Sequence, residues 1–86
     1  MQLTGMGTMR VKAVINRKKF NELLNANKWS IVDFHELLRQ DGLQIEYQAF
    51  SSMLNNRTGW SLTYAMLVCN RLNIQLEKLF YLEKMD

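Results

Sequence analysis

The sequence predicts a compact all-α domain of five short helices and allows a short β-strand before the first helix. Three observations favour this class. Apolar residues recur at the i, i+3, i+4 spacing of a helix in five separate segments. Proline is absent and glycine occurs only four times, so few positions interrupt a helix. The connections between the segments are short, which is typical of neighbouring helices in a small bundle.

The size and composition of the chain predict a single domain. It has 86 residues, of which 48% are hydrophobic and 22% are charged, whereas disordered chains are poorer in apolar residues. We expect residues 1–9 to form a flexible segment, native or cloning-derived, and residues 10–86 to form the domain. No apolar run approaches the ~18 residues that cross a bilayer, and no secretory leader opens the chain. A cytoplasmic protein is therefore expected.

The first two elements follow from residues 10–24. Residues 10–15 read Arg-Val-Lys-Ala-Val-Ile, and their alternation and branched side chains predict a short strand. Asn16 then suits the cap of a helix that begins at Arg17, with Phe20 and Leu24 on its buried face.

The second helix has the clearest start in the sequence. Ser30 and Asp33 form the pattern of a capping box, and Trp29 and Phe34 occupy the two positions of a hydrophobic staple. Gly42 is expected to end this helix or to lie in the turn that follows it.

Three further helices are expected from the spacing of apolar residues. The third runs from about residue 46 to residue 55. The fourth, capped by Ser61, runs from about 62 to 72, and the fifth begins near Leu76 and includes Phe80. The side chains expected on the inner faces of the third and fourth helices are Ala49, Phe50, Met53, Leu54, Leu62, Ala65, Met66, Cys69 and Leu72.

The residue types of catalytic and metal sites are scarce. His35 is the only histidine, and no zinc, protease or phosphate-loop motif is present. We expect His35 to be structural or at the surface, because an imidazole without an orienting partner seldom acts in catalysis. Cys69 is the only cysteine, which excludes an internal disulfide and a cysteine-built zinc site. It lies on the apolar stripe of the fourth helix, so we expect a small core residue. We therefore expect no enzyme, no metal or other cofactor and no small-molecule ligand.

Positive charge is gathered near the start of the predicted domain. The net charge is only +3, but five cations fall within ten residues that contain no acid. They are Arg10, Lys12, Arg17, Lys18 and Lys19. Residues 40–56, by contrast, contain no cation. Two interpretations of the basic cluster stay open: it serves an anionic partner, or it is tolerated because water screens it.

The third predicted helix carries an uncharged polar face. Gln48, Ser51, Ser52 and Asn55 are spaced i, i+3, i+4 and i+7, which aligns them on one outward side. A merely solvated face is more often filled with lysine and glutamate, which are better helix formers. Amides and hydroxyls suit base edges in the major groove of DNA. The alternative, a polar surface that happens to lack charge, stays open.

The order of these elements resembles the helix-turn-helix domain of the phage repressor and Cro-like family of bacterial and phage regulators. The resemblance covers about residues 16–82. It depends on residues 29–38 as the first helix of the motif, on residues 49–57 as the recognition helix and its exit, and on the closing stretch 72–80. It implies a fold like that of the lambda repressor, in the all-α class already expected.

The resemblance also implies a function and its residues. Members of this family place the recognition helix in the major groove, and two subunits bind half-sites about one helical turn apart. A Cro-like repressor from a phage or mobile element, binding a double-stranded DNA operator as a homodimer, is thus expected. The residues expected to face bases are Tyr47, Gln48, Ser51 and Ser52. Those expected to contact the DNA backbone are Lys28, Ser30, Asn55, Asn56, Arg57 and Thr58, with Arg17, Lys18 and Lys19 adding phosphate contacts.

The sequence departs from the family pattern at several positions. The turn over residues 39–45 makes the connection about five residues longer than usual, and His35 stands where a small residue is common. Ile31 replaces a polar phosphate-contacting residue, and Glu46 would repel phosphate at the start of the recognition helix. An alternative function on the same fold is a protein-interaction module that acts as an antirepressor or modulator of another regulator. It is favoured by the lengthened turn, the uncharged recognition helix and the exposed-looking Ile31 and Val32.

Two routes to a homodimer stay open in the sequence. Tyr81 and Leu82 extend the apolar surface of the fifth predicted helix, and the strand over residues 10–15 has an edge that can pair. Association only on DNA is a further alternative.

Overall fold

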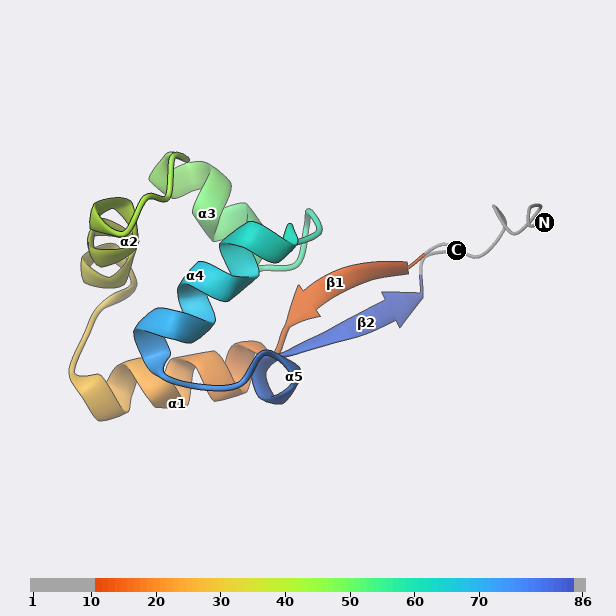
Figure 1. Ribbon diagram of the computed structural model, residues 1–86, viewed down its shortest axis with the longest axis horizontal. Helices are drawn as coiled ribbons and strands as arrows, with labels where there is room; N and C mark the ends of the chain where they lie inside the picture. The colour runs from red at the N-terminus through yellow and green to blue at the C-terminus, as the bar shows by residue number, and fades with distance from the viewer. Residues whose placement is uncertain (1–10, 85–86) are drawn as a thin grey trace.

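The computed structural model describes residues 11–84 as five helices and two strands (Figure 1). The expected flexible segment 1–9 lies outside these described residues. Most of the molecule is a cluster of helices, and the two strands run out from it side by side as a ribbon (Figure 1). In chain order the elements are β1 (Val11–Ile15), α1 (Arg17–Asn27), α2 (Ile31–Gln40), α3 (Tyr47–Leu54), α4 (Leu62–Leu72), α5 (Leu76–Leu79) and β2 (Phe80–Lys84).

The expected all-α class is wrong, because the last described residues, Phe80–Lys84, form a strand that pairs with the first one. Helices make up 59% and strands 14% of the described residues, so the fold is mixed α/β. β1 and β2 are antiparallel, with Val11 opposite Lys84 and Ile15 opposite Phe80. Phe80 lies four residues after Leu76, which fits a helix as well as a strand, but the backbone is already extended at Phe80 and α5 is a single turn. Pairing with β1 gives this stretch cross-strand hydrogen-bond partners in place of a continued helix.

The predicted starts of three helices are confirmed. In each case a side-chain oxygen of the cap accepts a hydrogen bond from the backbone N–H three residues later. These caps are Asn16, Ser30 and Ser61. The capping box of α2 is complete, because the Asp33 carboxylate accepts from the Ser30 N–H in return. Trp29 and Phe34 lie with their ring centroids 5.7 Å apart, as a hydrophobic staple requires.

A row of aromatic rings runs through the core from α1 to β2. Phe20 meets Phe34 edge-on at 5.5 Å, and Phe34 lies 6.5 Å from Phe50. Phe50 then meets Trp60 at 6.1 Å, and Trp60 meets Phe80 at 5.0 Å, both edge to face. These separations are those at which aromatic pairs attract beyond their area of burial. The row therefore connects the helical part of the molecule to the sheet.

Three residues expected on inner faces are exposed instead: Ala49, Leu62 and Met66. The buried side of α4 consists of Ala65, Val68, Cys69 and Leu72. Leu62 continues that spacing, yet it lies on the first turn of α4, where it is 64% exposed and borders a surface hollow. Ala49 and Met66 lie on the flanks of their helices. No helix within residues 11–84 is long and apolar enough to span a membrane.

Candidate nucleic-acid interface

The polar face of α3 lies at the surface of the molecule. α3 is held by three buried apolar residues, Phe50, Met53 and Leu54. Gln48 and Asn55 are exposed on the other side, and the two serines between them are half-buried. We call the face formed by Gln48, Ser51, Ser52 and Asn55 the neutral ridge. Its side chains are accessible to a ligand that approaches α3 from outside.

The long connection from α2 to α3 is ordered by its own packing. It comprises residues 41–46, and Leu43 in its middle is 2% exposed, with its N–H donating to the Leu38 carbonyl at 2.9 Å. Gly42 has φ of +117°, a conformation that favours glycine. The expectation that Gly42 lies in the turn after α2 is thus confirmed. A buried leucine and one glycine let the longer connection pack against the domain.

His35 supports the start of α3. The residue is 6% exposed, and its Nε2 lies 2.9 Å from the Ile45 carbonyl, to which it donates a hydrogen bond. Its ring packs edge-on against Tyr47 at 5.6 Å and against Phe50 at 5.3 Å. The structural role expected for His35 is therefore confirmed, and the imidazole fills the space that a small residue would leave between the two helices.

The exit from α3 is tied to β1 by Asn56. Its backbone has φ of +58°, which asparagine tolerates better than most residues. Its side-chain Oδ1 accepts from the Ile15 N–H at 3.0 Å, and its Nδ2 donates to the Ile15 carbonyl at 3.2 Å. Lys12 Nζ donates to the Asn56 carbonyl at 2.9 Å. The side-chain amide that the sequence assigned to the DNA backbone is thus engaged within the protein.

Two members of the basic cluster, Lys12 and Arg17, meet the end of the neutral ridge; Arg10 lies outside the described residues. Arg17 Nη1 donates to Asn55 Oδ1 at 2.8 Å, and Arg17 Nε donates to Asn21 Oδ1 at 3.1 Å. These contacts, with that of Lys12, bring β1 and the first turn of α1 beside the last turn of α3. Residues 38 and 44 positions apart in the chain therefore share one surface.

The remaining candidate residues lie at two places. Lys18 and Lys19 on α1, and Arg57 and Thr58 after α3, are exposed near the meeting point of α1 and α3. Lys28 and Ser30 are exposed at the connection of α1 to α2, on the left of Figure 1. Ser30 Oγ accepts the Asp33 N–H at 3.0 Å, so its hydroxyl hydrogen stays available to an acceptor such as phosphate.

Acidic groups border this surface as well. Glu46 is the cap position of α3, is exposed, and makes no side-chain capping bond. Asp33 is exposed in the first turn of α2. The ion pair within residues 11–84, Arg71 with Asp41 at 2.6 Å, instead ties α4 to the end of α2. The positive charge near α3 comes from β1, α1 and Arg57 rather than from the helix itself.

Sequence reasoning missed two residues of this region, Lys12 as a contact of the α3 exit and Asn56 as its anchor. The signal for Asn56 was its position after a helix, where asparagine often adopts a positive φ. Cys69 is buried as expected, and burial, with a smaller contribution from Glu77, raises the pKa of its thiol. No three histidine, cysteine, aspartate or glutamate side chains lie together as metal ligands within residues 11–84.

Comparisons with protein-family models, with curated proteins and with solved structures give no match for this chain.

Proposed function

We propose that this protein is a sequence-specific DNA-binding regulator of transcription, a Cro-like repressor that places α3 in the major groove of an operator. The observation that carries this proposal is the accessible neutral ridge of α3, with cations beside its exit. Its likeness in element order to the helix-turn-helix family supports the same function. A helix of this size fits the major groove, where each base pair presents a distinct set of donors and acceptors.

The neutral ridge supplies the groups that base edges require. The Gln48 amide can both donate and accept, and it can pair with adenine through two hydrogen bonds. The hydroxyls of Ser51 and Ser52 suit several bases. Tyr47 is held by its ring contact with His35 and would face the bases at the start of the helix.

The cations around α3 supply the contacts that carry affinity. Arg57 is exposed directly after α3, and Lys18 and Lys19 are exposed on the neighbouring turn of α1. Arg17 reaches the ridge itself through Asn55. Phosphate contacts of this kind release counterions, so binding should weaken steeply as salt rises. Lys28 and Ser30 would contact the backbone where α2 begins, as the first helix of such motifs does.

Selection of bound duplexes from a random pool, followed by a salt titration on the selected sequence, tests this function. For Gln48→Ala and Ser52→Ala we expect discrimination between the selected and a random duplex to fall by roughly 1–3 kcal/mol each. Arg57→Ala should weaken binding to both duplexes about equally. Gln75→Ala, an exposed glutamine at the cap of α5, is the matched control and should leave binding unchanged.

Two results would contradict the proposal. One is a selection that enriches no sequence, together with affinity that does not respond to salt. The other is an equal loss on selected and random duplexes for Gln48→Ala, Ser52→Ala and Arg57→Ala, which would remove the reading role from the ridge.

A protein-interaction module is the second candidate function. Glu46 favours it, because this exposed carboxylate stands at the start of α3 and would repel phosphate. Retention on heparin or on random duplex DNA at low salt separates the two functions. A DNA-binding regulator is held on both, whereas an antirepressor or modulator passes through.

A further inference from the structure

The outer edge of β1 is closed by the chain that follows α3. The Ile15 N–H and carbonyl are both bonded to the Asn56 side chain, at 3.0 and 3.2 Å. The Ala13 carbonyl accepts from the Trp60 N–H at 3.2 Å. Asn56 thus bonds to β1 in the manner of a residue on a third strand, through one donor and one acceptor. Pairing of another chain along this edge would have to displace these bonds.

Within residues 11–84, no segment pairs with the outer edge of β2. Ile15 and Ala13 point their backbone groups away from β2, so their cross-strand partners Phe80 and Leu82 point theirs away from β1. The Phe80 N–H is bonded to the Leu76 carbonyl. The N–H and carbonyl of Leu82 face outward from the sheet, and no group within residues 11–84 hydrogen-bonds to them.

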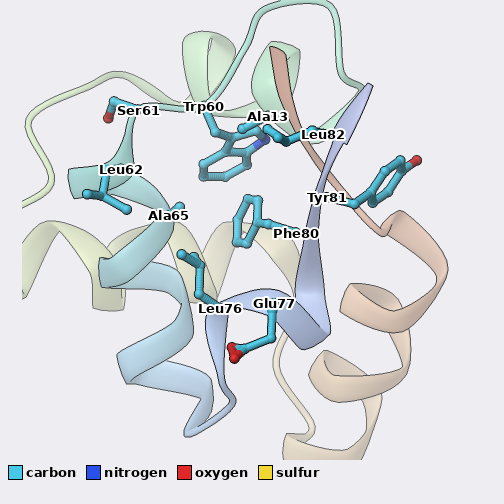
Figure 2. Close-up of a pocket in the computed structure, with 10 residues that line it drawn as sticks. All are labelled: Ala13, Trp60, Ser61, Leu62, Ala65, Leu76, Glu77, Phe80, Tyr81 and Leu82. Atoms are coloured by element: carbon cyan, nitrogen blue, oxygen red, sulfur yellow. The ribbon is translucent and has the colours of Figure 1, made fainter. Parts of the chain in front are cut away.

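Apolar surface adjoins this open edge. A hollow of about 500 Å³ lies between α4 and β2, with the rings of Trp60 and Phe80 at its base (Figure 2). Leu62 of α4 and Leu82 of β2 stand on either side of it and are 64% and 71% exposed (Figure 2). Tyr81, from the same strand, is 51% exposed. Exposed apolar groups gathered beside an open strand edge are typical of a protein–protein contact.

We propose that the occupant of this surface is a second copy of the chain, paired β2 to β2 in antiparallel orientation about a twofold axis at Leu82. The N–H and carbonyl of each Leu82 then bond to those of the other, and the pair of two-stranded sheets becomes one sheet of four strands. The two hollows lie on the same face of that sheet, and each copy covers the apolar groups of the other.

The charges of this surface complement themselves in that arrangement. Side chains alternate along a strand, so Phe80, Leu82 and Lys84 share the face that borders the hollow. Glu77, just before β2, also borders it. Antiparallel pairing about Leu82 sets Lys84 of each copy opposite Phe80 of the other, so that its side chain extends toward Glu77, three residues before Phe80. Two equivalent ion pairs result, as an isologous contact requires.

Stability of the sheet argues for the same occupant. A ribbon of two strands is marginal by itself, and it gains stability from further strands or from packing against a helix. In the part of the chain that the structure describes, the β2 edge carries no proline, bulge or covering loop of the kind that proteins use to block pairing. It carries only the charges at its end. Joining two copies closes the edge that the fold leaves open.

Sedimentation equilibrium of the full chain, without DNA, tests this interface apart from the proposed function. We expect a dimer that dissociates on dilution. Leu82→Lys should raise the dissociation constant about 100-fold, because the apolar contact is lost once in each copy. Val32→Lys is the matched control: Val32 is 61% exposed on α2, and its substitution should change the constant less than about threefold. A monomer mass at all concentrations, or equal effects of the two variants, overturns the proposal.

A charge exchange tests the orientation and stays informative if Leu82→Lys fails to fold. Lys84→Glu should weaken the dimer about five- to tenfold by placing like charges together. Glu77→Lys combined with Lys84→Glu should restore it to within about twofold. A double variant that is weaker than Lys84→Glu alone overturns the antiparallel pairing.

Discussion

The α2–α3 region and the sheet region expose opposite kinds of surface over one core. The first presents amides and hydroxyls, as at Gln48 and Ser52, and the second presents leucines, as at Leu62 and Leu82. A neutral polar face suits a hydrated partner that offers many donors and acceptors, such as the major groove. An apolar face beside an open strand edge suits another protein. This difference is the reason for proposing two contact surfaces with separate partners.

The two regions also differ in how they are built. α2, α3 and their connection are formed by residues close in the chain, and Leu43 and His35 hold them together locally. The sheet pairs Val11 with Lys84, from opposite ends of the described chain. Substitutions at the joint between the regions, and then within each, test whether they are independent.

The largest effect on stability is expected for Phe50→Ala, in the aromatic row that connects the two regions. Phe50 is fully buried and its ring contacts those of Phe34, His35 and Trp60, which connects α2 to the sheet. Removal of the ring should lower the free energy of unfolding by about 3–5 kcal/mol. Urea unfolding followed by circular dichroism measures this loss.

Tyr47→Ala is the control for that variant, because Tyr47 is an aromatic residue on the same helix but is 39% exposed. We expect it to cost about 1 kcal/mol or less. Equal losses for the two variants would mean that the aromatic row does not join the regions.

Local signals explain what could be predicted from the sequence. The caps at Asn16, Ser30 and Ser61 act within a few residues of themselves, and α1, α2 and α4 begin where those residues predicted. The neutral ridge is likewise a matter of spacing along one helix: Gln48 and Asn55 are exposed as predicted, and Ser51 and Ser52 are half-buried. The structure does not test whether those side chains bind DNA.

Contacts between residues distant in the sequence explain what could not be predicted. Phe80 fits the spacing of a helix, and only the presence of β1, at the other end of the chain, makes the strand the better state. The side-chain amide of Asn56 can hydrogen-bond to a phosphate as well as to the backbone of a strand. Its bonds to Ile15 therefore depend on where β1 lies. The exposure of Leu62 depends in the same way on an open hollow that no local pattern reveals.

The second largest effect is expected at the sheet end, for Asn56→Ala. The change removes both bonds to Ile15 and places alanine at a φ of +58°. Loss of satisfied backbone groups and the strained backbone together should cost about 2–3 kcal/mol. Thermal or urea unfolding measures the cost, and hydrogen exchange at the Ile15 amide should become faster than that of the Leu54 amide in α3.

Asn56→Gly separates the two contributions. Glycine loses the same hydrogen bonds but accepts the positive φ, so it should be about 1 kcal/mol more stable than Asn56→Ala. If the alanine variant is the more stable, the conformation of residue 56 does not matter and the anchoring role rests on the side chain alone.

A smaller effect is expected in the α2–α3 region, for His35→Leu. Leucine keeps most of the buried volume but leaves the Ile45 carbonyl without its donor at 2.9 Å. The free energy of unfolding should fall by about 1–2 kcal/mol. Amide chemical shifts in a ¹H–¹⁵N spectrum should change around Tyr47 and leave β1 and β2 unaltered. Changes that spread through the sheet would show that the two regions are coupled.

The smallest effect concerns pH and the packing of α4 against α5. Burial first, and Glu77 second, raise the pKa of the Cys69 thiol above its ordinary value of 9.0. The unfolded thiol therefore loses its proton at a lower pH than the folded one, and stability falls as pH rises through the unfolded pKa. From pH 7.5 to pH 9.5, the free energy of unfolding of the wild type should therefore fall more than that of Cys69→Ala. We expect the two decreases to differ by less than about 1 kcal/mol. Urea unfolding at both pH values gives the difference, since the other titrating groups are common to both proteins. If the wild type instead gained stability relative to the variant at high pH, the thiolate would be favoured in the fold, and Cys69 would have to lie outside the buried side of α4 that supports the sheet end.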